Sequence, residues 1–298
     1  MCAVQHTEDL LYLLQSGVPV NDVDDNGWSA IHWAVWRDVL ASVKMLINHG
    51  ADLTIRSKYG EDALQLAAIF RRVEIVEFLI DYIKPSANRE ADAYALLGTY
   101  CADFDMNTER AVYFFKKSIG VGVQFPVNPP IAAYNNILEI TDLESLISIE
   151  NDPDAVIKQG MIKRERVLSN RHPSVWFGVS GCGDYYYQRA QYRRYVDLRK
   201  FSYTRLCAPI RWYEGFELQT RLFYKMIVVD HTSVTLDDVS ELIQMGFYNI
   251  PDTAAESNIL LQFVYLLYVA SQLANTDQEK ARVIVLCSCL FSYLDMQR

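Results

Sequence analysis

Several common signals are missing from this sequence of 298 residues. Its six cysteines are scattered without the spacing of a disulfide framework; they are Cys2, Cys101, Cys182, Cys207, Cys287 and Cys289. The first fifteen residues lack the basic start and the cleavage site of a secretory signal. Reduced thiols, and a cytoplasmic or nuclear location, are therefore expected.

Long apolar runs are also missing. The longest, Ile259 to Ala274, is interrupted by Gln262, Ser271 and Gln272. A bilayer-spanning helix needs about 20 predominantly apolar residues. This run is shorter and more polar, so it predicts a buried helix, and no membrane association is expected.

No catalytic or metal-binding pattern is complete. Cys287 and Cys289 point to different faces of a helix and have no second Cys or His pair, so core packing is the favoured interpretation. His231 follows Asp230 without a nucleophile nearby in the sequence. Gly120-Val121-Gly122 lacks the third glycine and the preceding strand of a dinucleotide-binding loop. We therefore expect a protein that is not an enzyme, with no metal and no cofactor.

The composition is that of a globular protein, with 51% apolar and 22% charged residues. The net charge of −9 hides an asymmetry, because residues 158–225 contain fourteen Lys and Arg against five Asp and Glu. Such a basic segment can form a docking face, or it can attract acidic parts of the same molecule.

A repeat of 33 residues runs through the N-terminal part, the period of ankyrin repeats. Gly27 and Gly60 lie 33 residues apart, and the same offset relates Ala34 to Ala67. His32 occupies the usual ankyrin histidine position, where a structural role is expected. The pattern predicts an array over residues 1–84, made of half a repeat at 6–25 and repeats at 26–58 and 59–84. Four helices are expected in it: Ser29–Val35, Leu40–Asn48, Ala63–Phe70 and Glu74–Ile83.

Residues 91–298 have the pattern of TPR-like helical repeats. Tyr94-x2-Leu97-Gly98-x2-Cys101 is followed by Ala111-x3-Phe115-x2-Ser118, with small residues where two helices touch. A poorer copy begins at Gly183. Apolar spacing predicts further helices near Ile131–Thr141, Asp154–Leu168, Leu236–Met245, Asn258–Leu273 and Glu279–Tyr293. The predicted fold class is all-α, an ankyrin-repeat solenoid followed by TPR-like helical repeats.

The string Lys163-Arg164-Glu165-Arg166-Val167-Leu168, then His172-Pro173, resembles the Fem (feminization) family of ankyrin/TPR proteins. The order of ankyrin and TPR parts supports this resemblance over about residues 28–293. It implies a substrate receptor of cullin-RING ubiquitin ligases, in which an early ankyrin groove grips substrate C-termini and a C-terminal box docks the cullin. The ankyrin repeats here resemble the family's last ones before the TPR part. We therefore expect neither the residues that grip C-termini nor the cullin box.

Six side chains occupy the positions that face the concave groove of ankyrin repeats, and these are the candidate partner-binding residues: Trp28, Trp36, Arg37, Glu61, Ile69 and Phe70. Exposed tryptophans need a covering surface, and Trp and Arg are typical interface anchors. The alternative is that the partial first repeat covers Trp28 and Trp36 as a cap.

A second candidate surface is basic and rich in tyrosine. Its cations are Arg189, Arg193, Arg194, Arg199, Lys200 and Arg205. Basic residues interleaved with aromatic ones can bind single-stranded nucleic acid. The favoured interpretation is a TPR helix whose tyrosines pack and whose arginines are solvated, because the chain as a whole is acidic. An acidic protein partner fits equally well.

These patterns lead to a hypothesis of a protein-interaction adaptor, a substrate-recognition or scaffold subunit in cullin-RING-dependent degradation. Its expected partners are a ligase substrate and, less directly, cullin and elongin. One alternative is a scaffold that no longer docks a cullin. Another is a nucleic-acid-associated TPR protein that uses the basic helix at 186–205.

Overall fold

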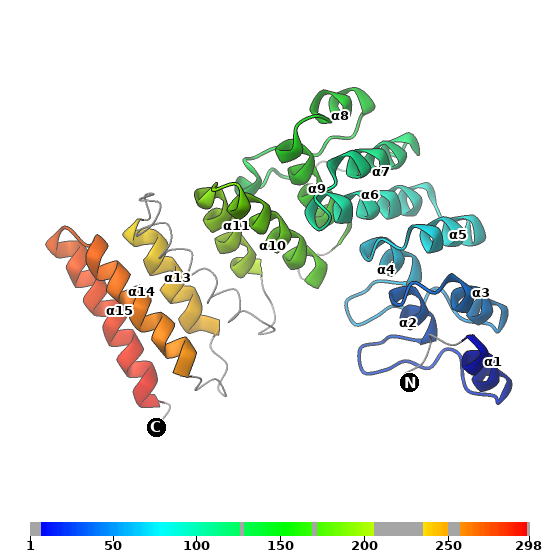
Figure 1. The fold of residues 1–298 in the computed structure, drawn as a ribbon, viewed down its shortest axis with the longest axis horizontal. Helices are drawn as coiled ribbons and strands as arrows, with labels where there is room; N and C mark the ends of the chain where they lie inside the picture. The colour runs from blue at the N-terminus through cyan, green and yellow to red at the C-terminus, as the bar shows by residue number, and fades with distance from the viewer. Residues whose placement is uncertain (1–6, 126–127, 169–171, 206–234, 250–256, 297–298) are drawn as a thin grey trace. The chain divides into compact units, whose positions relative to one another are not determined.

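The computed structural model describes residues 7–125, 128–168, 172–205, 235–249 and 257–296. Within these ranges the regular elements are helices, and no strand is present. The chain divides into two compact units, Met1–Gln188 and Arg189–Arg298 (Figure 1). The predicted class, an all-α repeat protein, is confirmed.

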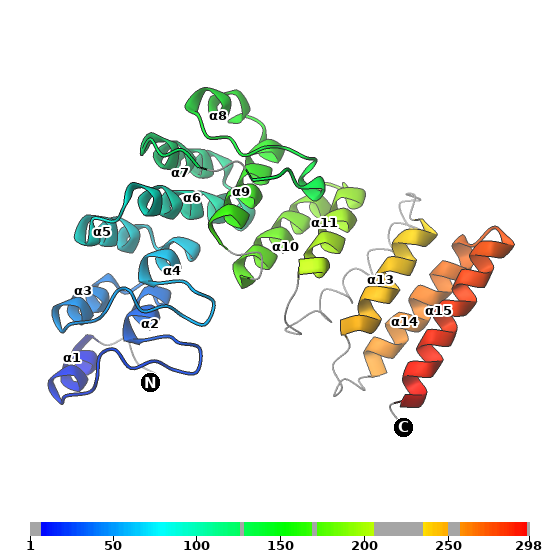
Figure 2. The same ribbon diagram turned by 180° about the vertical axis from the view of Figure 1, so that it is seen from behind.

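The first unit contains eleven described elements. They are α1 (Thr7–Gln15), α2 (Ala30–Trp36), α3 (Leu40–Asn48), α4 (Ala63–Ile69), α5 (Val73–Ile83), α6 (Ala87–Asp103), α7 (Thr108–Gly120), the 3₁₀ turn η1 (Ala132–Tyr134), α8 (Leu143–Ile149), α9 (Pro153–Val167) and α10 (Pro173–Gln188). The first helices of the repeats, α2 and α4, form one row, and α3 and α5 form a second row beside it (Figure 2). The array therefore has the layered arrangement that its 33-residue period predicts.

The four predicted ankyrin helices are confirmed to within one residue at each end. Ala34 and Ala67 are fully buried where α2 and α4 stack. The turns also repeat, since Asp38 and Arg71 lie 33 residues apart and both have positive φ angles, 63° and 56°. His32 is buried, and its Nδ1 accepts a hydrogen bond from the Ser29 backbone N–H at 3.2 Å. Burial lowers the pKa of His32, which favours the neutral ring. The neutral ring caps the start of α2 through its hydrogen bond with Ser29.

Small residues allow the TPR-like helices to approach one another closely. A Cβ atom at Gly98 of α6 would overlap the ring of Phe115 in α7. Helix α9 packs on α6 and α7, and Gly160 lies against Ala102 at this contact. Helix α10 then packs on α6 and α9. The predicted helix Asp154–Leu168 corresponds to α9 and is confirmed.

The predicted helix Ile131–Thr141 is wrong. Only Ala132–Tyr134 forms a 3₁₀ turn, because Asn135 and Asn136 adopt left-handed φ angles of 61° and 56°. A helix that the sequence pattern missed, α8, starts immediately after this segment. Its N-cap Asp142 accepts a hydrogen bond from the backbone N–H of Ser145 at 2.8 Å.

The second unit contains α11 (Tyr192–Arg205), α13 (Leu236–Asn249), α14 (Ser257–Leu273) and α15 (Asp277–Met296). The last three pack on one another and agree with the three predicted C-terminal helices. Thr235 and Asp238 form a capping box at the start of α13, with reciprocal hydrogen bonds of 3.0 and 3.2 Å. Local capping therefore fixes where this helix begins.

The two compact units do not coincide with the predicted domains at 1–84 and 91–298. The first unit includes the ankyrin array together with α6 to α10. A compact unit is defined by packing, whereas a repeat is defined by its sequence period. The division therefore does not test the predicted repeat boundaries, which remain a prediction.

Candidate functional site

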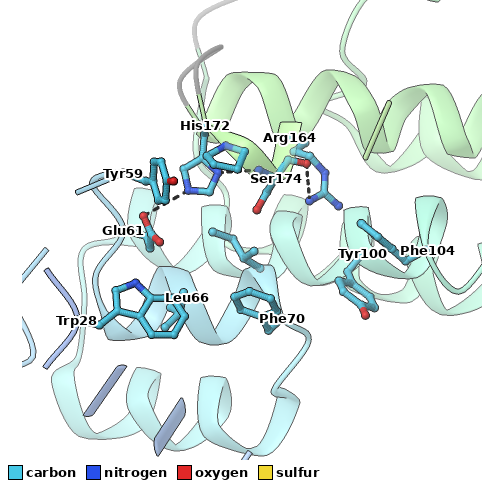
Figure 3. Close-up of a pocket in the computed structure, with 12 residues that line it drawn as sticks. Trp28, Tyr59, Glu61, Leu66, Phe70, Tyr100, Phe104, Arg164, His172 and Ser174 are labelled. Carbon is cyan, nitrogen blue, oxygen red and sulfur yellow. Dashed lines mark hydrogen bonds and ion pairs between the residues drawn. The ribbon is translucent and has the colours of Figure 1, made fainter. Parts of the chain in front are cut away.

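A pocket of about 330 Å³ lies in the first unit, where the ankyrin array meets the helices that follow it (Figure 3). It is lined by Trp28, Tyr59, Glu61, Leu66, Ile69, Phe70, Tyr100, Phe104, Arg164, His172, Pro173 and Ser174. The ankyrin array contributes residues from α4 and from the loops before α2 and α4. The opposite side comes from the C-terminal end of α6, from α9 and from the start of α10. Its wall is mostly apolar and aromatic, the usual character of a binding pocket.

Four of the six predicted groove residues line this pocket: Trp28, Glu61, Ile69 and Phe70. Trp36 and Arg37 do not line it. Trp36 instead packs against Trp28, with ring centroids 6.4 Å apart. The structure therefore brings most of the predicted set together and places the other two beside it.

Trp33 is part of the same aromatic cluster and was not among the predicted residues. Its ring makes edge contacts with Trp28 and Trp36, at centroid distances of 5.0 and 5.5 Å. Its Nε1 donates a hydrogen bond to Asp24 at 3.2 Å. The helical spacing of Trp33 and Trp36 was the available signal. Each of the three tryptophans is half-buried, so each has part of its ring covered and part exposed.

Glu61 and His172 form the polar wall near Trp28. The Ser174 backbone N–H donates to Nδ1 of His172 at 3.1 Å, so in the neutral ring Nε2 carries the proton. This Nε2 lies 3.3 Å from Glu61 and donates to its carboxylate. Burial alone would raise the pKa of Glu61, but hydrogen bonds from His172 and Ser57 outweigh it and lower the pKa. The carboxylate is 4% exposed and already has a partner.

Arg164 forms the wall at the Tyr100 end of the pocket. Its guanidinium pairs with Asp103 at 2.7 Å and donates to the backbone carbonyl of Ser174 at 3.4 Å. Both side chains of the pair are essentially inaccessible to solvent. Burial raises the pKa of Asp103 to about 6, although Arg164 acts in the opposite direction. The pair holds α9 against α6 and fixes this wall.

The rest of the basic string on α9 is also paired inside the first unit. Lys163 lies 3.1 Å from Glu139, and Arg166 lies 2.9 Å from the same carboxylate. Arg166 also pairs with Asp92 at 2.6 Å. Of the two explanations for the charge asymmetry, attraction between parts of one molecule therefore accounts for these cations.

Three cations stack on aromatic rings, two on rings that line the pocket and one on Trp36, which packs against the lining residue Trp28. Lys58 lies over Tyr59 at 5.2 Å from the ring centroid, and Arg71 lies over Tyr100 at 5.6 Å. Arg37 lies over Trp36 at 4.8 Å. Arg71 also pairs with Asp105. Lys58 and Arg37 are exposed, and within the described ranges neither forms an ion pair.

In the predicted basic face, Arg193 and Lys200 pair with acidic residues of the second unit. Arg193 lies 2.6 Å and Lys200 2.7 Å from Asp238 of α13. Arg189 precedes α11, and Arg194 is exposed on it. Arg199 and Arg205 belong to α11, but their side chains lie outside the described part. The interleaved Tyr192 and Tyr195 are buried, and Tyr186 and Tyr187 lie on α10; Tyr203 is another whose side chain is not described. A binding role for this face stays a prediction.

Metal binding and membrane insertion find no structural support among the described residues. No group of three or more His, Cys, Asp or Glu side chains is arranged to hold a metal ion there. No described helix has the length and hydropathy to cross a bilayer. Cys287 is half-buried on α15, and the side chain of Cys289 is outside the described part.

Comparisons with known proteins agree with this architecture. The family model for ankyrin repeats, in three copies, matches residues 1–90. A Drosophila melanogaster relative, "Protein fem-1 homolog CG6966", is 27% identical over 163 residues, which are 52% of this chain and 24% of the relative. The human "Protein fem-1 homolog C" is 27% identical over 168 residues, 54% of this chain and 27% of the relative. Over the matched part the chain is therefore similar to Fem-1 proteins.

A longer match extends this similarity further along the chain. The Mus musculus "Protein fem-1 homolog A-like" is 24% identical over 246 residues, 67% of this chain and 37% of the relative. The chain spans about a quarter of the length of the first two relatives. The ankyrin repeats and the similarity to Fem-1 proteins together support a protein-interaction adaptor.

Proposed function

We propose that this chain is a substrate-recognition or scaffold subunit in cullin-RING ubiquitin-ligase-dependent protein degradation. The proposal includes a location in the cytoplasm, the nucleus or both, and no enzymatic activity of its own. The Fem-1 similarity supports the pathway. The observation that carries the recognition role is the pocket between the ankyrin array and the following helices.

The pocket has the chemistry of a binding site rather than that of an active site. Its charged groups are already committed, Glu61 to His172 and Arg164 to Asp103. Pairing of this kind fixes the walls before a partner arrives, which reduces the ordering cost of binding. The lining serine, Ser174, contacts His172 through its backbone N–H, and the other ring nitrogen of His172 is bonded to Glu61.

The nucleic-acid alternative receives less support than the adaptor. Binding along a phosphate backbone depends on cations that are free to replace counterions. Arg193 and Lys200 of the predicted basic face share Asp238 as a partner. The protein-binding proposal is therefore the better supported of the two.

Affinity purification from cells tests the proposal directly. The ligase role predicts that the tagged chain recovers a cullin, the elongins and at least one ubiquitylated protein, whether it docks the cullin itself or through another subunit. The variant Phe70→Ala should still recover cullin and elongins while it loses ubiquitylated proteins, because Phe70 lines the pocket. If neither cullin nor elongin is enriched over a tag-only control, the ligase role is wrong and the free-scaffold alternative stands.

A further inference from the structure

The pocket's size and lining restrict what it can accommodate. Typical ligand pockets measure about 300–1,000 Å³, and this one is near the lower limit. Its volume suits one or two large apolar side chains. Leu66 and Phe70 lie between Trp28 at one end and Tyr100 at the other (Figure 3), and Ile69 also lines the pocket. An aromatic or leucine side chain would bury its full surface against these groups.

The charges inside the pocket do not select a charged anchor. Glu61 is 4% exposed and accepts from His172, and Arg164 is buried against Asp103. A ligand cation would have to replace His172 as the partner of Glu61, and a ligand anion would have to compete with Asp103. The first replacement would break the buried hydrogen bond between His172 and Glu61, and the second would leave the buried Asp103 carboxylate without its partner, which is costly. The anchor is therefore apolar.

The charges at the edge of the pocket are positive and available. Lys58 lies over Tyr59, which lines the pocket, and Arg37 lies over Trp36, which packs against the pocket residue Trp28. Both cations are exposed, and neither is neutralised by a described carboxylate. Stacking on a ring, and for Lys58 also a hydrogen bond to the Asn26 side chain, holds each cation in place without neutralising its charge. The edge of the pocket thus complements negative charge.

We propose that this pocket binds a short internal peptide segment that has a Phe, Trp or Leu anchor flanked by acidic residues. The anchor enters the pocket between Phe70 and Tyr100, and the acidic flanks pair with Lys58 and Arg37. The segment needs no free terminus, because no group in the pocket is available to hold a terminal carboxylate. This inference rests on the proposed function only in treating the pocket as the recognition site.

Fluorescence anisotropy with defined peptide pools tests the inference on the purified full chain. The probe is a dye-labelled pool, blocked at both ends, with Phe, Trp or Leu at the centre and Asp or Glu on both sides. The first matched pool carries Lys or Arg flanks, and the second carries a central Ala. The acidic pool should bind at least about tenfold more tightly than either matched pool, and its affinity should fall as salt is added.

Two variants locate the binding. Phe70→Ala should weaken the acidic pool by about tenfold or more, as for an interface hot spot. Tyr82→Ala removes an exposed ring outside the pocket and should change nothing. Because Phe70→Ala can alter folding, its thermal melt is recorded as well. Lys58→Glu leaves the pocket wall intact and, because Arg37 remains, should remove most of the preference for acidic flanks.

Lys44 supplies the matched control for Lys58, since it also stacks on a ring, that of Phe78, but lies away from the pocket. Lys44→Glu should leave the flank preference unchanged. The inference is overturned if the basic pool binds better to the unmodified chain, or if Lys44→Glu and Lys58→Glu act equally. It is also overturned if no pool binds, or if oligouridylate displaces the acidic pool. Recovery of cullin is not involved, so failure here leaves the ligase proposal untouched.

Discussion

At the scale of single residues, buried ion pairs explain what the basic string on α9 does. Lys163, Arg164 and Arg166 pair with carboxylates from α6 and from the segment before α8. A buried pair adds little net stability compared with apolar packing, but removal of one partner leaves an uncompensated charge. Arg164 is the most buried of the three and also forms a wall of the pocket.

Arg164→Met is expected to destabilise the first unit by about 3–5 kcal/mol at pH 7, because the Asp103 carboxylate stays buried without a partner. The double variant Arg164→Met/Asp103→Leu should recover most of this loss. Urea unfolding followed by tryptophan fluorescence measures both, since four of the five tryptophans lie in the first unit. Equal losses in the two variants would mean that packing, rather than charge, sets the cost.

The loss of stability caused by Arg164→Met should depend on pH in a defined direction. Burial raises the pKa of Asp103 to about 6 in the native chain, above its ordinary value of 3.8. A carboxyl whose pKa is raised on folding holds its proton more tightly in the folded state, so stability increases as pH falls through the folded pKa. Without Arg164 this effect should grow, and the loss measured at pH 7 should shrink at pH 5. A constant loss between pH 5 and 7 would contradict the assignment.

Asp238 gives the opposite pH dependence in the second unit. Its burial would raise the pKa, but hydrogen bonds from Lys200, Thr235 and Arg193 lower it to about 2. A depressed carboxyl pKa stabilises the fold above the ordinary value of 3.8, and the contribution disappears as pH falls toward 2. Asp238→Asn should therefore cost about 2 kcal/mol at pH 7 and little near pH 2. Circular dichroism melts at several pH values provide the measurement.

Asp237→Asn is the matched control for this prediction. Asp237 is the neighbouring residue, its side chain is 69% exposed, and it pairs with Arg282 at the surface. Exposed pairs contribute about 0–1 kcal/mol, so this variant should melt close to the unmodified chain at each pH. If the two variants behaved alike, the pairing around Asp238 would not be the source of the pH dependence.

At the scale of helices and repeats, the 33-residue period carries most of the information. It places α2 to α5 correctly, because the same small and apolar residues are needed wherever one repeat stacks on the next. Ala67 is fully buried at such a contact. Ala67→Leu should overpack the contact and cost about 1–3 kcal/mol in a thermal or urea melt. Ala41→Leu, at an exposed position on α3, should cost almost nothing.

An unchanged melt for Ala67→Leu would mean that the register of the repeats is wrong.

Periodicity is less informative where the chain leaves the repeats. Between η1 and α8 the apolar spacing of Ile131–Thr141 resembles a helix, yet the left-handed conformations of Asn135 and Asn136 end it after one turn. Apolar spacing does not encode these backbone angles, and the capping role of Asp142 was the signal for α8.

At the scale of the whole molecule, the candidate site is only half predictable from the sequence. The ankyrin period places Trp28, Glu61 and Phe70 on one concave face, and these residues do line the pocket. The opposite wall, which includes Tyr100 and Arg164, comes from helices that obey no common period with the array. Its position depends on long-range packing of α6, α9 and α10. Neither a motif nor a spacing indicated His172 as the partner of Glu61.

The most direct test of the central claim is a comparison of protein half-lives. Proteins captured by the unmodified chain but not by Phe70→Ala are first identified, and their half-lives are then measured in cells with and without the chain. We expect removal of the chain, or inhibition of cullin-RING ligases, to lengthen these half-lives, and restoration with Phe70→Ala to leave them long. Half-lives that are identical in the presence and absence of the chain would contradict a role as a substrate receptor.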